Sequence, residues 1–430
     1  MTNIFIQLSK YIIIALMAAY TFSCFSIFTR NYEDEEKRVL IRQDVLLFLM
    51  QLLAFLTMYL SENDMRILFI YAALAVVLLA VIILYNLIYP NVSRLVVNNM
   101  CMLITSGMIM ITRLSADNDS PYGSAVRQLI FVVMGAVIAL IVPVLIRKLT
   151  FLVASRVMYS KEFKNIVITT AVAAAHVLIL VLSTDLGAAL IFFVVYLVML
   201  YVATRQPLYA IAGLLAGAGA AVIGYHLFAH IQVRVEAWQD PIGTYGSSGY
   251  QVAQSLFAIG SGSWFGTGLF QGQPDMIPVS AIVEEMGVIY GLCLILICVS
   301  CYVMFLNIAM ELRNRFYKLV ALGLGTCYIF QVFLQIGGVT KFIPSTGMTL
   351  PFVSYGGSSM LSTMIMFAII QGLYILREDE EEELEREKEA ENGLGRTAAR
   401  KKKKGTPKFE DVPKQRQKQR PRQKQRARTK

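Results

Sequence analysis

The chain has 430 residues, of which 56% are hydrophobic, and its mean hydropathy is +0.59. This composition is too apolar for a soluble domain and is typical of polytopic membrane proteins. The formal net charge of +10 does not indicate a nucleic-acid-binding protein, because residues 396–430 hold 16 Lys and Arg against two acidic residues. That segment alone has a net charge of +14, so the rest of the chain sums to −4. We therefore predict an all-α integral membrane protein with a basic tail.

Long apolar runs predict about eleven transmembrane helices, each close to the roughly 20 residues that a bilayer requires. The first run has neither a strongly basic flank nor an evident small-residue cleavage site, so we expect a retained helix rather than a removed signal. The predicted spans are Tyr11–Phe28, Val45–Leu60, Ile67–Tyr89, Val96–Thr112, Gln128–Ile146, Asn165–Ser183, Leu186–Ala203, Leu208–Ala229, Met286–Ile308, Tyr317–Ile336 and Ser359–Leu376.

Lys and Arg concentrate in alternate loops of this arrangement. The first, fifth and ninth loops and the tail are rich in them, whereas the even-numbered loops are poorer. Because positive residues favour the cytoplasmic side, we predict an outer N-terminus and a cytoplasmic C-terminus. The longest inter-helix segment, residues 230–285, then becomes an outer loop. All six cysteines fall inside predicted spans, where we expect apolar packing rather than disulfides or a metal site.

Within residues 377–430, Glu378–Glu391 are mostly acidic, and we expect them to continue the last helix into the cytoplasm as a solvated stalk. The polybasic tail that follows has almost no apolar side chains. Such a composition predicts disorder. On the cytoplasmic side, the tail would attract anionic lipid head groups. Nonspecific binding of RNA or DNA is the competing interpretation; we favour lipids because the tail is tethered at the membrane, and we expect no specific nucleic-acid partner.

The segment Gln335–Leu361 is unusually rich in glycine, proline and hydroxyl residues for a chain between two membrane helices. Proline fixes φ and removes an amide donor, and glycine permits close approaches and backbone shapes closed to other residues. A single plain helix is excluded. Irregular backbone between spans is tolerated where it is buried in protein or lines a watery cavity, so we expect its polar groups to face a substrate. The alternative is a purely structural re-entrant turn.

Charged residues of the predicted outer face are the remaining candidates. Asp185 lies at a span boundary, where a carboxylate is either functional or the N-cap of the following helix, and both can hold. In the long loop, Tyr250–Ile259 predicts a short amphipathic helix. The carboxylates Asp275, Glu284 and Glu285 follow, and we expect them close to Arg234 and Lys341.

Several motifs together resemble the SEDS (shape, elongation, division and sporulation) family of bacterial cell-wall proteins, to which FtsW and RodA belong. The resemblance covers residues 96–376 and leaves 1–95 as three additional transmembrane helices. The motifs are Thr184–Ala189, Arg234 with Asp240-Pro241, Gly249–Gln251, Gln254-Ser255, Ala258–Gly262, Glu284–Gly287, Pro344–Gly347 and Pro351–Ser359.

The resemblance implies a multi-pass protein of the bacterial cytoplasmic membrane that polymerises lipid II at the outer face beside a class B penicillin-binding protein. It implies a carboxylate base, positive charge or a divalent cation such as Mg²⁺ on the pyrophosphate leaving group, and a lipid groove. Asp275 is the catalytic candidate. The substrate-binding candidates are Asp185, Arg234, Lys341, Pro344, Thr346, Gly347, Pro351, Ser354, Tyr355, Gly356, Gly357 and Ser358, and the structural or partner-binding ones are Tyr250, Gln251, Gln254, Glu284 and Glu285.

Two departures from the family pattern stand beside this resemblance. The family's loop aspartate precedes its Glu-Glu pair by eight residues, where this chain has Met276, and Asp275 lies one residue further away. The chain also has only residues 147–164 where the family has a further helix and a Gln-Pro-Ser-Glu segment. Two other roles therefore remain open: a non-catalytic scaffold for a penicillin-binding protein, and a flippase for the lipid-linked precursor.

Overall fold

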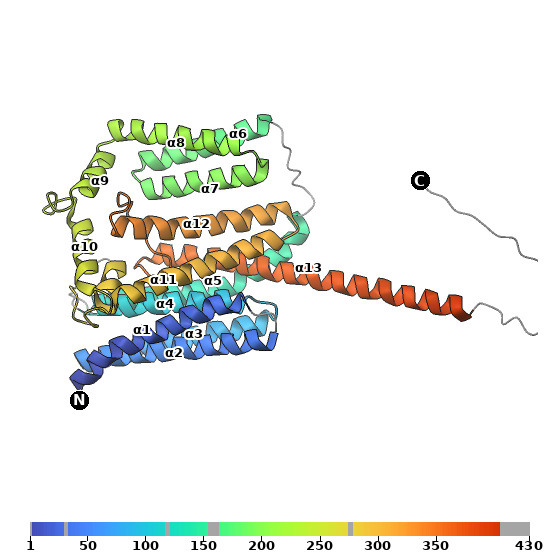
Figure 1. The fold of residues 1–430 in the computed structure, drawn as a ribbon, viewed down its shortest axis with the longest axis horizontal. Helices are drawn as coiled ribbons and strands as arrows, with labels where there is room; N and C mark the ends of the chain where they lie inside the picture. The colour runs from blue at the N-terminus through green and yellow to red at the C-terminus, as the bar shows by residue number, and fades with distance from the viewer. Residues whose placement is uncertain (1, 30–32, 117–120, 154–162, 274–277, 405–430) are drawn as a thin grey trace, which may run out of the picture. The chain divides into compact units, whose positions relative to one another are not determined.

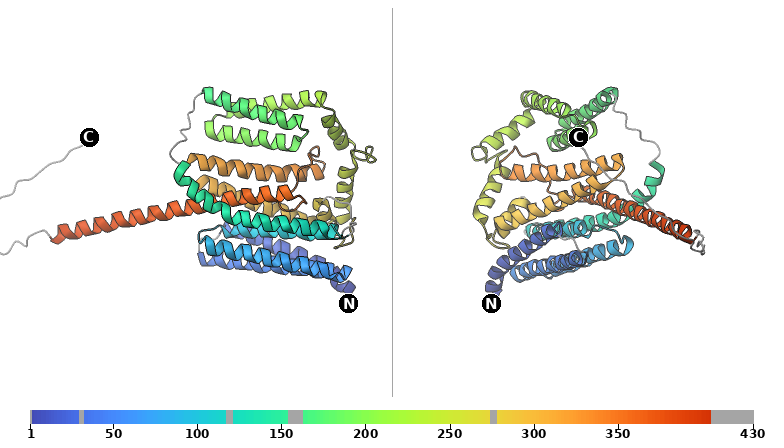
Figure 2. Two further views of the ribbon diagram at one scale, coloured as in Figure 1. Left: turned by 180° about the vertical axis from the view of Figure 1, so that it is seen from behind. Right: turned by 45° about the vertical axis from the view of Figure 1, so that its right-hand side comes forward.

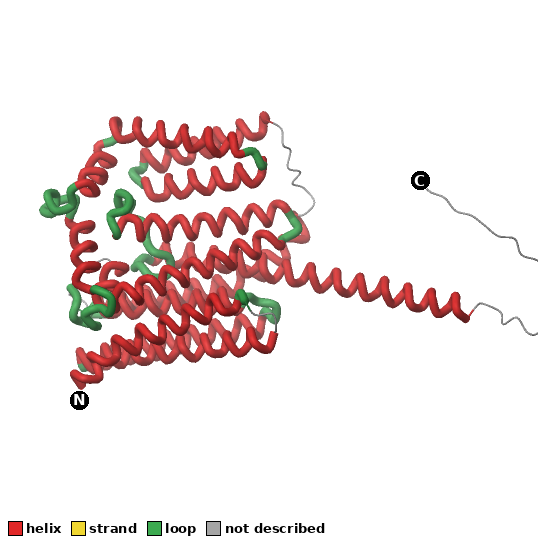
Figure 3. Tube along the Cα trace, in the orientation of Figure 1, coloured by secondary structure: helices red, strands yellow, loops and turns green. Residues whose placement is uncertain are grey.

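The computed structural model describes residues 2–29, 33–116, 121–153, 163–273 and 278–404. These residues form thirteen helices and no strand, which confirms the all-α prediction (Figure 3). The chain divides into two compact units, Met1–Asp379 and Glu380–Lys430. The helices are α1 Thr2–Ile27, α2 Glu33–Glu62, α3 Met65–Ile88, α4 Arg94–Leu114, α5 Gly123–Val153, α6 Phe163–Leu182, α7 Leu186–Thr204, α8 Pro207–Leu227, α9 Ala229–Gln239, α10 Tyr250–Gly262, α11 Pro278–Glu311, α12 Arg315–Val339 and α13 Gly357–Lys404.

Ten helices in the described ranges are long and apolar enough to cross a bilayer, against about eleven predicted. The difference is α6, whose described apolar part, Ala173–Leu182, is shorter than a span. All six cysteines are free and buried or half-buried, as expected for packing residues. α13 continues through the acidic residues to Lys404, as expected for Glu378–Glu391, and the disorder predicted for the tail is wrong for its basic residues up to Lys404. The tail from residue 405 onward lies outside the described residues, so disorder there stays a prediction.

The helices of the first unit lie side by side in successive layers (Figures 1 and 2). α1, α2 and α3 pack together at one edge, and α1 and α2 contact α11 and α4 of the next layer. α11 packs on α12, α12 on α7, and α7 on both α6 and α8 at the opposite edge. The three N-terminal helices are therefore joined to the bundle along their length rather than connected only by a loop.

α4 is the central helix of this unit. The whole 18-residue apolar window within it is buried, whereas only 6% of the corresponding window of α8 is buried. An aromatic cluster continues the core next to it: the Phe367 ring of α13 lies 4.8 Å from Phe352, 5.0 Å from Phe305 and 5.3 Å from Tyr328. Since these rings come from α11, α12, α13 and the segment before α13, burial of the rings locks that segment onto the bundle.

One end of the first unit carries nearly all of the irregular structure. The N-terminus of α1, the short helices α9 and α10, and the connection between α12 and α13 lie together there, on the left of Figure 1. We call this the α9–α10 end. The amphipathic helix predicted at Tyr250–Ile259 is confirmed as α10, whereas α9 was not anticipated within the predicted loop.

Candidate functional site

The connection between α12 and α13, residues 340–356, is the irregular segment that the glycines and prolines predicted. α12 ends in a turn in which the amides of Phe342 and Ile343 both donate to the Gly337 carbonyl oxygen, at 2.8 and 3.1 Å. Further on, the Leu350 amide donates to Ser354 Oγ at 3.0 Å, and Phe352 has a positive φ of 66°. Because the ring of Phe352 is buried, packing offsets this strained conformation.

Neighbouring helices touch the backbone of this segment directly. A Cβ placed on Gly107 of α4 would lie 2.4 Å from the Phe352 carbonyl oxygen, and one on Gly357 would lie 2.3 Å from the Phe131 ring. The Gly356 amide donates to Gln128 Oε1 at 3.3 Å. Residues 350–354 of the segment are thus buried in protein, as an irregular backbone in a membrane requires, whereas Phe342 and Tyr355 are exposed.

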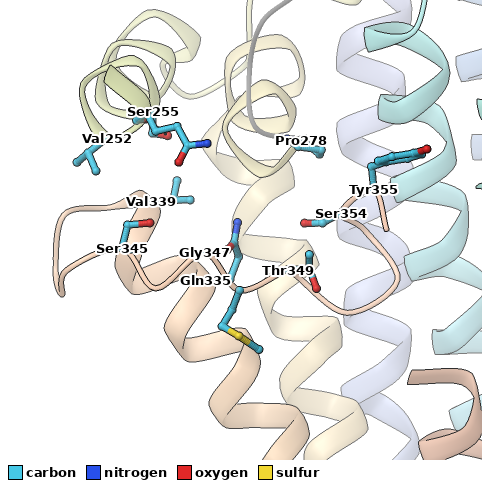
Figure 4. A pocket seen from close by; sticks show the side chains of 13 residues that line it. Val252, Ser255, Pro278, Gln335, Val339, Ser345, Gly347, Thr349, Ser354 and Tyr355 are labelled. Atoms are coloured by element: carbon cyan, nitrogen blue, oxygen red, sulfur yellow. The ribbon is translucent and has the colours of Figure 1, made fainter. Parts of the chain in front are cut away.

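A pocket of about 180 Å³ opens between this segment and α10 (Figure 4). Figure 4 shows Val252 and Ser255 of α10 facing Ser345 and Val339, with Ser354 and Tyr355 further along, near Pro278. None of the lining residues carries a charge at neutral pH. They are Gln251, Val252, Ser255, Pro278, Gln335, Gly338, Val339, Ser345, Gly347, Met348, Thr349, Ser354 and Tyr355.

α9 supplies the polar contacts that hold the 340–356 segment beside the pocket. The Arg234 guanidinium donates from Nη1 to the Ser345 carbonyl oxygen at 2.7 Å, and Trp238 donates from Nε1 to that of Lys341 at 3.0 Å. The Lys341 ammonium returns to the Gln239 carbonyl oxygen at 3.2 Å. The structure therefore brings the candidates Arg234 and Lys341 together with the segment, each bound to a backbone oxygen.

The turn before α7 meets the same segment from the other side. A Cβ on Gly187 would lie 2.5 Å from the Met348 side chain and 3.3 Å from the Thr346 carbonyl oxygen. Asp185 accepts a 3.0 Å hydrogen bond from the Ala188 amide, so the capping alternative is confirmed. Its carboxylate is exposed, and a role in substrate binding stays a prediction.

Glu284 and Glu285 of α11 are engaged elsewhere, contrary to the expected proximity to Arg234 and Lys341. The Glu285 carboxylate pairs with Arg113 of α4, at 2.7 Å between Oε1 and Nε, and this pair is buried. Glu284 accepts from Ser261 Oγ at 3.2 Å and from the Gln273 amide at 3.1 Å. The reason is the bend of α11 at Gly287, where φ is 88°, which turns the two carboxylates toward the loop preceding the helix.

The other candidates divide between the pocket and its supports. Gln251, Gly347, Ser354 and Tyr355 line the pocket. Gln254 instead donates to the Tyr245 hydroxyl at 2.8 Å, and the Tyr250 ring makes a tilted contact with the Tyr245 ring, with 5.3 Å between ring centres. Asp275 lies outside the described residues. Pro344, Thr346, Pro351 and Gly356 belong to the segment, and Gly357 and Ser358 begin α13; none of the six lines the pocket.

The sequence interpretation missed several residues that the structure places at the site. Gln335, Thr349 and Ser255 line the pocket, and Trp238 holds the segment. Arg113 directly follows the predicted span Val96–Thr112 and was not among the candidates, although an arginine at the end of an apolar run is a signal for a buried partner. In the described ranges no three His, Cys, Asp or Glu residues form a group that could hold a metal ion. The expectation of a divalent cation stays untested.

The fold and the pocket define a multi-pass α-helical membrane protein whose candidate site is built from loop segments at one end of its bundle. A model of the FtsW/RodA/SpoVE family, described as cell cycle protein, matches residues 142–378. The chain belongs to this family. The matched residues begin later than the expected 96–376, so the boundary at residue 96 stays a prediction.

Curated relatives match over part of their length. The chain is 38% identical over 199 residues to the "Peptidoglycan glycosyltransferase RodA" of Mycobacterium tuberculosis H37Rv, which covers 45% of this chain and 42% of the relative. It is 34% identical over 207 residues to the "Stage V sporulation protein E" of Bacillus subtilis 168, covering 45% and 54%. The chain thus matches only about half of the length of each of these relatives.

A solved structure entitled "Structural coordination of polymerization and crosslinking by a peptidoglycan synthase complex" aligns with a TM-score of 0.47 at 20% sequence identity. The alignment covers 77% of this chain and 97% of that one.

Proposed function

We propose that the chain polymerises lipid II at the outer face of the bacterial cytoplasmic membrane, working beside a class B penicillin-binding protein. Membership of the family and relatives named as peptidoglycan glycosyltransferases support this proposal. The structural observation that carries it is the uncharged, hydrogen-bonding pocket against the 340–356 segment, with the Arg234 guanidinium next to it.

The chemistry of the pocket fits a neutral polar group better than a pyrophosphate. Its lining offers the amides of Gln251 and Gln335 and the hydroxyls of Ser354 and Tyr355, which suit sugar hydroxyl and acetamido groups. Its volume is below the roughly 300 Å³ at which pockets for whole drug-sized ligands begin, so it would hold one part of a larger substrate. We assign it to a sugar unit of the growing glycan.

Positive charge stands just outside this pocket. A Cβ on Gly347, a lining residue, would lie 3.7 Å from Arg234 Nη1, so the guanidinium borders the same wall. The guanidinium has five N–H donors, and the contact with Ser345 accounts for only one of them. Arg234 is thus suited to bind the leaving pyrophosphate. Lys341, four residues before Ser345 in the segment, is a second cation.

The proposed reaction joins one sugar hydroxyl to the anomeric carbon of a second, lipid-linked sugar. The hydroxyl oxygen forms the new glycosidic bond, the bond from the anomeric carbon to the pyrophosphate breaks, and the pyrophosphate leaves with the electron pair. The hydroxyl proton passes to a carboxylate base, for which we propose Asp275. A divalent cation could supply further charge on the leaving group, but no residue is assigned to it.

The proposal also fixes orientation. We propose that the α9–α10 end faces outward and that the N-terminus lies outside, because alternate loops differ in Lys and Arg content. The basic tail then lies in the cytoplasm, where we propose that it binds anionic lipids of the inner leaflet.

A polymerisation assay tests the activity. The purified full-length chain, alone and with its cognate penicillin-binding protein, is incubated with lipid II, and glycan strands are resolved on a gel. We expect polymer from the unmodified chain and a loss of at least about 10²-fold for Asp275→Ala, because a general base contributes roughly 10²–10⁴-fold. Polymer that survives the substitution excludes Asp275 as the base. No polymer under any partner condition would favour the scaffold.

A further inference from the structure

We propose that Arg113 and Glu285 form a buried clamp that positions the loop before α11, which makes Arg113 a positioning residue for the proposed reaction. We use "the clamp" for Arg113, Glu284 and Glu285, and "the α10–α11 loop" for the described residues 263–273. The catalytic part of this inference rests on the proposed function. Arg113 lies on α4, outside the residues matched by the family model.

The ion pair is sealed from solvent. Arg113 Nε lies 2.7 Å from Glu285 Oε1, and the two side chains are only 3% and 1% exposed. Taking two charges out of water is costly, and the attraction between them offsets that cost only when further hydrogen bonds satisfy the remaining donors and acceptors. The partners that supply those bonds show what the pair does in this chain.

Most of those partners belong to the backbone of the α10–α11 loop. Arg113 Nη2 donates to the Gly272 carbonyl oxygen at 2.9 Å, and its guanidinium lies 4.7 Å from the centre of the Phe270 ring. The Glu285 carboxylate accepts from the amides of Phe270 and Gly272, at 3.3 and 3.2 Å. Arg113 and Glu285 thus bind two backbone amides and one backbone carbonyl oxygen of the loop, at Phe270 and Gly272.

Glu284 extends the clamp by one residue. Its Oε2 accepts from the Gln273 amide at 3.1 Å, and its Oε1 accepts from Ser261 Oγ at 3.2 Å. A Cβ on Gly272 would lie 2.8 Å from Glu284 Oε2, so the loop backbone lies directly against the carboxylates with no space between them. Residues 270–273 are therefore bound to the first turns of α11 through the side chains of Glu284 and Glu285.

The kink in α11 at Gly287 keeps the Glu284 and Glu285 carboxylates directed at the α10–α11 loop. A Cβ on Gly287 would lie 2.4 Å from the Trp264 carbonyl oxygen, and one on Gly266 would lie 2.3 Å from the Glu285 carbonyl oxygen. The Thr267 and Gly268 amides donate to the carbonyl oxygens of Glu284 and Glu285, at 2.8 and 2.9 Å. Residues 264–268 of the loop therefore contact the kink through backbone atoms. The side chains of Glu284 and Glu285 bind residues 270–273 of the same loop.

The clamp holds the last described residue before the segment that contains the candidate base. Gln273, which Glu284 holds, immediately precedes residues 274–277, and Pro278, which follows them, begins α11 and lines the pocket. The clamp thus holds Gln273 on one side of Asp275 in sequence, and on the other side Pro278 begins the helix that carries Glu284 and Glu285. Misplacing a catalytic group by about 1 Å can cost on the order of 10²-fold in rate, so this control of position bears on catalysis.

Hydrogen exchange on the full-length protein in lipid nanodiscs tests the clamp without any assay of activity. We expect Arg113→Gln to speed exchange of the amides of Phe270 and Gly272 by roughly 10-fold or more, because their shared acceptor, the Glu285 carboxylate, loses the guanidinium that orients it. The matched control is Arg66→Gln, which breaks an exposed pair with Asp64 and should leave these amides unchanged. Unchanged exchange at 270–273 in Arg113→Gln overturns the clamp.

Kinetics on the same proteins separate positioning from mere stability. Arg113→Lys keeps the charge for Glu285 but lacks the planar fork that reaches Gly272 at the same time. It also serves as the decisive variant if Arg113→Gln does not fold. We expect Arg113→Lys to melt close to the unmodified chain while kcat for lipid II polymerisation falls about 10-fold or more and KM changes less than about threefold.

Full activity of a folded Arg113→Lys protein would show that only the charge matters and would overturn the positioning role. If the unmodified chain makes no polymer while Arg113→Gln loses protection at 270–273, the proposed function and the catalytic part of this inference both fail. The exchange result then still establishes the clamp as a structural contact, so the two failures are distinguishable.

Discussion

Gly107 is the residue at which α4 meets the 340–356 segment, and no larger residue fits there. An added Cβ would lie 2.4 Å from the Phe352 carbonyl oxygen and 2.8 Å from Val353 Cα, and backbone atoms cannot move aside as a flexible side chain can. We expect Gly107→Ala to destabilise the protein by roughly 1–3 kcal/mol, as overpacking does, and to lower its melting temperature in detergent.

The matched control is Gly219→Ala in α8, because no atom lies within 4 Å of a Cβ at that position. Alanine is a better helix former than glycine by up to about 1 kcal/mol, so this variant should melt at or above the temperature of the unmodified chain. Equal melting temperatures for the two variants would contradict the close approach of α4 to the segment.

For single residues, the sequence predicts local backbone conformation better than it predicts which distant residue each side chain contacts. The glycines, prolines and hydroxyls of Gln335–Leu361 predicted an irregular segment, because φ requirements are local properties of the chain. The Arg113–Glu285 pair could not be predicted in this way, since its partners are 172 residues apart in sequence. Only the packing of α4 against α11 brings them together.

The short helix α9 acts as a brace for the 340–356 segment. Trp238 Nε1 donates to the carbonyl oxygen of Lys341, and this is the carbonyl of the peptide bond that trypsin would cleave. Trp238→Phe removes that N–H together with the fused five-membered ring, and loss of the hydrogen bond alone should cost about 0.5–1.5 kcal/mol of local stability. Because cleavage of a transiently opened loop follows its open population, we expect cleavage after Lys341 to accelerate roughly threefold to tenfold.

The other tryptophan of the chain provides the control. Trp264 is 62% exposed, and Trp264→Phe should leave the rate of cleavage after Lys341 unchanged. Mass spectrometry of the tryptic fragments measures both rates. An identical rate in Trp238→Phe and the unmodified chain would show that α9 does not brace the segment.

Helices with long apolar runs were predicted from the sequence, whereas short helices of mixed polarity were not. α7 and α11 to α13 follow long apolar runs, because a spanning helix needs about 20 such residues in sequence. α9 carries no comparable signal: it has 11 residues of mixed polarity, among them Arg234, Glu236 and Trp238. Its helix was therefore hidden within the predicted loop, and with it the contacts that α9 makes to Ser345 and Lys341.

For the whole molecule, the sequence predicts the number of membrane-spanning helices to within about one, but not which of them are neighbours. Hydropathy is similar for α4 and α8, at 1.7 for both, yet one is the buried centre of its unit and the other is almost wholly uncovered. Burial depends on packing partners, and a hydrophobic residue meets lipid or protein equally well. The polar residues of α4, such as Asn98 and Asn99, are its clearest distinguishing mark, because polar groups in a membrane face protein.

Orientation is the property of the whole molecule on which the proposed function depends. Native cysteines give little background, since five are buried and Cys327 is half-buried, so single introduced cysteines report the side on which they lie. Ser247 lies at the α9–α10 end and Gln206 in the turn between α7 and α8, and both are exposed. We expect a membrane-impermeant maleimide to label Ser247→Cys on intact cells.

Gln206→Cys and Thr429→Cys should be labelled only after the membrane is opened, because the predicted topology places the α7–α8 turn and the basic tail in the cytoplasm. Neither substitution changes the charge distribution that sets topology, so the label reports the native arrangement. Labelling of Thr429→Cys on intact cells would place the tail outside and exclude inner-leaflet lipids as its partner. Labelling of Ser247→Cys only in opened membranes would put the pocket on the cytoplasmic side, away from the surface on which glycan strands are assembled.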